Sequence, residues 1–114
     1  MALSVTVQGF HTRLGTQANG RFAIADITST DGSDVVVYTV PPVDVEYAIL
    51  TVSICNREQY AQSGVSVAVA SADVPQLSEF IEWNATISPN GVLERTQIIC
   101  AANERIIVRV TNPT

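Results

Sequence analysis

The sequence predicts a single all-β domain, an eight-stranded antiparallel β-sandwich of the jelly-roll or Greek-key kind. Val, Ile and Thr recur with a period of two in short runs, which is the pattern of half-buried strands. Gly, Pro, Asn and Asp separate these runs, as turns require. No window carries a convincing helical stripe, and the best candidate is a turn or two over residues 10–18.

Length and composition fit one domain with a core of its own. The chain has 114 residues, of which 46% are hydrophobic and 15% are charged, and a chain of this size can bury a stable core without metal or disulfides. Cys55 and Cys100 lie at predicted strand ends, and neither has a partner at the spacing of metal ligands. We expect buried free thiols, no metal and no cofactor.

Eight runs carry the strand signal. They cover residues 3–7, 21–28, 34–40, 45–55, 65–70, 79–87, 92–99 and 105–111. The second run, "RFAIADIT", would place Phe22, Ile24 and Asp26 on one face. The third, "DVVVYTV", stops at Pro41 and Pro42, because proline donates no ladder hydrogen bond. The fourth, "VEYAILTVSIC", is the longest and is expected to be central.

The later runs are shorter and are joined by clear turn signals. In the fifth run, "VSVAVA", three valines share one face. The sixth and seventh runs flank "SPNG", which predicts a hairpin because Pro fixes φ and Asn-Gly tolerates positive φ. In the seventh, Glu94 and Arg95 are adjacent and must point to opposite faces, so they cannot form one site. The eighth, "RIIVRVT", follows the turn "CAANE".

The N-terminal residues look different from the rest of the chain. Residues 1–20 are mostly polar and contain "QGFHTRLGTQANG", in which Phe10 and Leu14 have no obvious core position. We expect an irregular arm over residues 1–20 that orders on a neighbouring molecule, followed by the sandwich domain over residues 21–114.

Charge and hydropathy exclude two classes of partner. The net charge is −5, there is no Lys, and the six Arg residues are scattered. Without a basic stripe, nucleic-acid binding is not expected. No segment resembles a signal peptide, and none approaches the length of about 20 apolar residues that a membrane span needs.

Candidate chemistry is sparse, so we do not expect an enzyme. A nucleophilic triad needs a positioned His, and His11 is the only one. Glu79, Glu82 and Glu94 could supply a hydrolase with paired carboxylates, although the solvated face of strands is the simpler interpretation. No glycine-rich phosphate loop is present.

The aromatic residues suggest a sugar-binding or contact surface as an alternative. Trp83 and the three tyrosines could form a platform for a sugar. Trp83 alternates with Ile81 and Ala85, so the core is its expected location. Tyr60, in the "REQYAQ" segment, is the only aromatic residue expected at the surface, where it would serve a lectin site or a protein contact equally well.

Several of these stretches together resemble one group of proteins. The stretches are "VVVYTVP", "LTVSICNR", "SVAVA", "EFIEWNATISPNGVLERTQII" and "RIIVRV". They resemble small β-sandwich virion proteins of tailed bacteriophages of the cyanophage and marine-phage type, in which "LYTVP", a strand ending in "CNR", "EYIEYD", "NGVLERTG" and a "KVYVRS"-like strand follow one another. The resemblance covers residues 34–110. Trp83 stands where the pattern has Tyr, and Gln97 where it has Gly.

The resemblance implies a non-catalytic virion structural protein. Its first implication is a capsid decoration (cement) protein that stabilises the head by contacts across capsid subunits, as a homotrimer on the capsid surface after assembly in the host cytoplasm. The partner would be the major capsid protein or another virion protein. The alternatives are a tail, neck or fibre component, or a carbohydrate-binding adhesion module. The candidate contact residues are Phe10, Leu14, Tyr60, Glu94 and Arg95.

Overall fold

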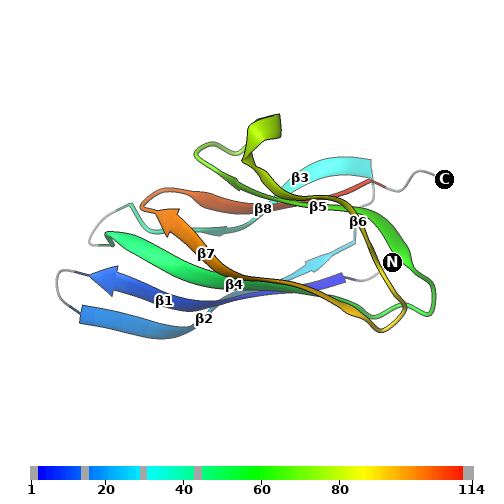
Figure 1. The fold of residues 1–114 in the computed structure, drawn as a ribbon, viewed down its shortest axis with the longest axis horizontal. Coiled ribbons are helices and arrows are strands. Elements are labelled where there is room, and N and C mark those ends of the chain that lie inside the picture. The colour runs from blue at the N-terminus through cyan, green and yellow to red at the C-terminus, as the bar shows by residue number, and fades with distance from the viewer. Residues whose placement is uncertain (1–2, 14–15, 29–30, 43–44, 112–114) are drawn as a thin grey trace.

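Two four-stranded antiparallel sheets pack face to face in the computed structural model (Figure 1). The structure describes residues 3–13, 16–28, 31–42 and 45–111. The elements are β1 (Leu3–Arg13), β2 (Thr16–Ile27), β3 (Asp31–Thr39), β4 (Tyr47–Asn56), β5 (Gln62–Ala70), the short 3₁₀ helix η1 (Leu77–Glu79), β6 (Phe80–Ile87), β7 (Val92–Ala101) and β8 (Arg105–Thr111). The predicted all-β sandwich is confirmed, and each predicted run overlaps one strand.

The strand order is that of a jelly roll with its last strand moved to the start of the chain. The first sheet has the order β2-β1-β4-β7 and the second has the order β3-β8-β5-β6. The antiparallel pair β5–β6 is nested within β4–β7, and that pair within β3–β8, as in a rolled-up double Greek key, while β1 pairs with the consecutive strand β2. β1 begins and β8 ends at the same end of the sandwich (Figure 1).

The inner faces of both sheets form one apolar core. β4 is central in its sheet, as predicted, and Leu50, Val52 and Ile54 are buried at every second position. Val65 of β5 and Ile106 of β8 join them from the other sheet. Burying such side chains contributes roughly 1.5–3 kcal/mol each, which is the main force holding the sheets together.

The predicted irregular arm over residues 1–20 is wrong where the structure describes it. Residues 3–13 form β1, which lies between β2 and β4, and residues 16–20 begin β2. Within the described residues 10–13 and 16–18, the same strands replace the helical turn expected over residues 10–18. The alternation that starts at Leu3 continues through Gly9 and His11, which sequence patterning does not recognise as inward positions. Gly9 is required because a Cβ there would collide with the backbone oxygen of Ile49 on β4.

The predicted hairpin around "SPNG" is also wrong, although the turn is present. The amide of Gly91 donates to the carbonyl of Ser88 at 2.8 Å, and Asn90 has φ 58°. However, β6 pairs with β5, whereas β7 pairs with β4 in the other sheet. The turn is thus an arch between the sheets, because turn residues specify a chain reversal and not the partner of each strand.

A β-bulge places Trp83 outside, against the prediction of a core position. Val65 and Val67 of β5 lie opposite Ala85 and Glu82 of β6, so β6 has one extra residue in this interval. Asn84 adopts φ 55° at this point. The extra residue reverses the alternation, and Trp83 is 58% exposed.

A second bulge separates the residues that β2 was predicted to place on one face. Val7 and Gln8 of β1 lie opposite Ala23 and Arg21, which leaves Phe22 as the extra residue. Phe22 packs against the core, while Ile24 and Asp26 are exposed. The predicted shared face of Phe22, Ile24 and Asp26 is therefore wrong.

Candidate interaction surfaces

The segment between β5 and β6 stands off the outer face of the second sheet (Figure 1). We call residues 71–79 the contact loop. Arg105 of β8 anchors it, with Nε 2.8 Å from Oδ1 of Asp73 and Nη1 donating to the carbonyl of Ser71 at 2.6 Å. The Glu79 carboxylate accepts a 2.8 Å hydrogen bond from the amide of Gln76. These bonds fix the loop before it meets any partner.

The contact loop exposes two large aliphatic side chains. Val74 is 72% exposed and Leu77 is 77% exposed. A single exposed aliphatic residue is ordinary, but two in one anchored loop form a small apolar surface of the kind found at protein contacts. Sequence patterning missed this surface, because "SADVPQLS" reads only as a polar connection.

A second apolar surface crosses the outer face of the first sheet. Phe10 of β1 lies opposite Ile49 of β4, which lies opposite Ile99 of β7. We call Phe10, Ile49 and Ile99 the apolar row. Ile99 is largely exposed, and the nearby Tyr47 is partly so. Phe10, predicted as a contact residue of an arm, therefore sits on a rigid sheet instead. Leu14 lies outside the described residues.

Tyr60 is exposed as predicted but is separated from the apolar row. It lies after the end of β4, whereas Ile49 lies near the beginning of that strand. Its carbonyl accepts a 2.9 Å hydrogen bond from Nδ2 of Asn56, and the same amide nitrogen donates to the carbonyl of Ile87 at 3.1 Å. Buried Asn56 thereby fixes the loop that carries Tyr60.

Glu94 and Arg95 point to opposite faces of β7, as predicted. Glu94 accepts a 2.9 Å hydrogen bond from the hydroxyl of Ser53 on the outer face. Arg95 reaches the other sheet, where Nη1 lies 3.4 Å from Oε2 of Glu82 on β6. Each has a partner within the chain, so pairing across a subunit boundary stays a prediction. Glu82, on β6 of the second sheet, lies opposite the inward-facing Val67, whereas Glu94 lies on the outer face of the first sheet, so the two carboxylates do not share a cleft.

The lone histidine is the buried member of an aromatic stack whose other members, Phe22 and Tyr38, are half-buried. Nε2 of His11 lies 2.7 Å from the hydroxyl of Tyr38, and the His11 ring stacks on Phe22 with 4.1 Å between centroids. His11 is only 7% exposed. This arrangement holds β1, β2 and β3 together.

Both cysteines are free thiols, but only Cys100 is buried. Burial, reinforced by the nearby Glu104 carboxylate, raises the pKa of the Cys100 thiol to about 12. A thiol with such a pKa stays protonated at neutral pH, so it is a poor nucleophile. Within the described part of the chain, no three His, Cys, Asp or Glu side chains are placed to hold a metal ion. Across the same residues, no helix is long and apolar enough to cross a membrane.

Comparisons with known proteins gave no relative: no family model, no curated protein and no solved structure matches this chain.

Proposed function

We propose that this chain is a non-catalytic structural protein of a tailed-phage virion, and specifically a decoration protein that bridges subunits on the capsid surface. The resemblance over residues 34–110 supports the class. One structural observation supports the bridging role. Exposed apolar surfaces lie on opposite outer faces of the sandwich: the contact loop lies on the second sheet and the apolar row lies on the first. A protein that joins two neighbours needs two such faces.

Affinity would come from a few anchors on a rigid frame. Burying Val74 or Leu77 in a partner would contribute at most roughly 1.5–3 kcal/mol each. Because Arg105 and Glu79 already hold the contact loop, little ordering entropy is lost on binding. Repetition over a symmetric lattice would then add many weak contacts into stable attachment.

The experiment uses particles that lack this chain. We expect their heads to be more sensitive to heat and pressure, and purified protein added back to restore resistance. The Val74→Ser, Leu77→Ser double variant should fold but fail to restore it. Val92→Ser is the matched control, because Val92 is 59% exposed and lies outside both surfaces. Unchanged resistance of particles without the chain would contradict the head assignment.

A tail, neck or fibre component is the second candidate within the same class. The same two apolar faces would suit a stacked ring or a fibre, since both also join successive copies or neighbours. The position of the chain on intact particles separates these candidates from head decoration.

A further inference from the structure

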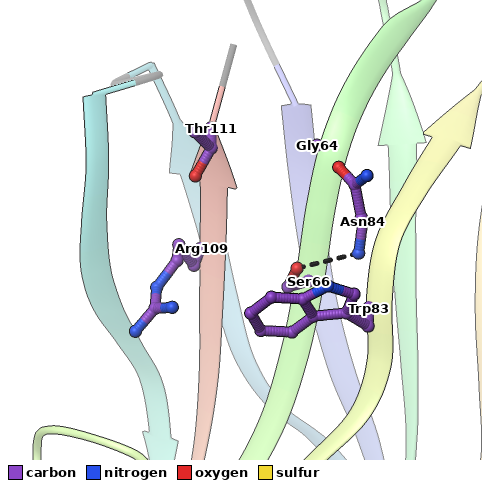
Figure 2. A pocket seen from close by; sticks show the side chains of 6 residues that line it. All are labelled: Gly64, Ser66, Trp83, Asn84, Arg109 and Thr111. Carbon is purple, nitrogen blue, oxygen red and sulfur yellow. Dashed lines mark hydrogen bonds between the residues drawn. The ribbon is translucent and has the colours of Figure 1, made fainter. Parts of the chain in front are cut away.

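A small pocket lies on the outer face of the second sheet, between β6, β5 and β8 (Figure 2). Its volume is about 220 Å³, and it is lined by Gly64, Ser66, Trp83, Asn84, Arg109 and Thr111. Gly64 brings β5 close to β8 here, because a Cβ at this position would collide with the backbone oxygen of Thr111.

Trp83 supplies the pocket with a fixed aromatic surface. The bulge in β6 turns its indole outward, and the ring of Phe80 packs edge-on against it with 4.9 Å between centroids. Figure 2 shows the indole lying across Ser66 toward Arg109. A large aromatic side chain held 58% exposed in a structured strand is a surface that a ligand can cover.

Asn84 adopts a left-handed backbone conformation beside this platform. Its φ is 55°, and its backbone amide donates to the hydroxyl of Ser66 at 3.0 Å. Its side-chain amide forms no hydrogen bond with any described residue. Strained positions at bulges recur at binding sites, where they aim a side chain. Both the amide oxygen and the amide nitrogen of Asn84 are therefore available to a ligand.

Arg109 supplies hydrogen-bond donors, and its positive charge is already balanced by the carboxylate of Asp34. Its Nε lies 2.8 Å from Oδ1 of Asp34, and its guanidinium carbon lies 4.9 Å from the centre of the Phe80 ring. Between these two groups the guanidinium is fixed, while its Nη atoms make no hydrogen bond within the described residues. Thr111, at the end of β8, also lines the pocket.

We propose that this pocket binds one pyranose ring of a neutral glycan. The apolar face of the sugar would stack on Trp83, and its hydroxyls would bond to Asn84, Arg109 and Thr111. The volume is below the range of about 300–1,000 Å³ typical of pockets for drug-sized ligands, which suits a single ring. Because Asp34 neutralises Arg109, the pocket lacks the unpaired cation that would select a phosphate or a carboxylate. The site is independent of the proposed virion role, since it needs only the folded chain.

The test uses the intrinsic fluorescence of the purified protein, because Trp83 is the only tryptophan. The native chain is titrated with the methyl pyranosides of glucose, galactose, mannose and N-acetylglucosamine. We expect a saturable change with at least one of them, with a dissociation constant in the millimolar range.

A matched pair of variants separates binding from folding. Asn84→Gly places a residue that tolerates positive φ at this position but removes the side-chain amide. The affinity for the sugar should therefore fall by about tenfold or more, while the fold is kept. Asn90→Gly is the control, because Asn90 has nearly the same φ, 58°, in a remote turn. It should bind like the native chain.

Three outcomes would overturn the proposal. The first is no saturable response to any of the sugars by the folded chain. The second is equal binding by the Asn84→Gly variant. The third is a response to adenosine monophosphate or to a short aromatic peptide with none to sugars, which would assign the pocket to another class of ligand.

Discussion

The hydroxyl of Tyr38 on β3 lies 2.7 Å from Nε2 of His11 on β1, and this hydrogen bond connects the two sheets through the core. Phe22 stacks on the His11 ring beside it. The contact explains how an imidazole can occupy an inward position of a strand, where a polar group needs a partner. It also anchors the start of the chain, which sequence patterning left outside the domain.

Removing this hydrogen bond should destabilise the fold. Tyr38→Phe keeps the ring but deletes the hydroxyl, and we expect the free energy of unfolding to fall by about 1–3 kcal/mol, because a buried group loses a partner. Urea denaturation followed by circular dichroism measures the change. Tyr60→Phe is the control, since Tyr60 is exposed, and should stay within about 0.5 kcal/mol of the native chain. Equal stability of the two variants would contradict this account of the core.

Stability should decline at alkaline pH through Cys100. Its pKa is raised from an ordinary 9.0 to about 12 by burial first and by Glu104 second, so between these values the folded state keeps a proton that the unfolded chain loses. The resulting stabilisation is complete below about pH 9 and is lost as pH rises toward 12. The raised pKa of Tyr38, due mainly to burial, acts in the same direction.

Chemical denaturation across pH 8–12 tests this linkage. Cys100→Ala should be less stable at pH 8 because it leaves a cavity, but its stability should decline less steeply with pH than that of the native chain. Identical slopes for the two proteins would show that the Cys100 thiol does not carry the alkaline transition.

Gln97 occupies a backbone conformation that suits glycine, and Gln97→Gly should stabilise the fold. Its φ is 56°, at a bulge where Val52 and Leu50 of β4 lie opposite Arg95 and Ile98 of β7. Relief of left-handed strain amounts to about 1–2 kcal/mol and is partly offset by the greater chain entropy of glycine. We expect a net gain of about 0.5–1 kcal/mol by thermal denaturation.

Thr96→Gly is the control for the Gln97 substitution. Thr96 is the preceding residue of β7, outside the left-handed region, so glycine there should destabilise by about 0.5–1 kcal/mol. A loss of stability in both variants would contradict the assignment of strain to Gln97.

Arg95→Ala should impair self-association more than folding. The ion pair of Arg95 with Glu82 joins an exposed side chain to a half-buried one at a distance of 3.4 Å, so its loss should cost about 1 kcal/mol or less. We expect the native chain to form a trimer by light scattering and the variant to shift toward the 12.2 kDa monomer. Arg57→Ala, which removes a similar exposed pair with Asp26, should leave the trimer intact. A larger effect of Arg95→Ala on melting temperature than on assembly would indicate an internal structural pair.

The sequence predicted the strands well because alternation and turn chemistry are local. The aliphatic period of β4 and the turn at Asn90 both appear where they were expected. Strand order was predicted only as a class of topology. The placement of β6 and β7 in different sheets was not predicted, because strand pairing depends on contacts between residues far apart in the chain.

The candidate sites were predicted less well, because bulges are not visible in alternation. The extra residue beside Asn84 moved Trp83 from an expected core position to the surface, where it lines the pocket. Of the predicted contact residues, Phe10 and Tyr60 lie in separate places, and Glu94 and Arg95 have partners in the chain. A positive φ cannot be predicted from the presence of asparagine alone. At Gln97 the resemblance did offer a signal, because the resembled pattern has Gly at this position and Gly favours positive φ.

The proposal that this chain is a virion decoration protein is tested most directly by antibody labelling of intact particles of the proposed phage, viewed by electron microscopy. A decoration protein predicts label spread over the whole head surface and none on the tail. Label confined to the tail, neck or fibres would contradict head decoration. The absence of any label, with the chain also missing from the protein content of purified particles, would contradict a virion role altogether.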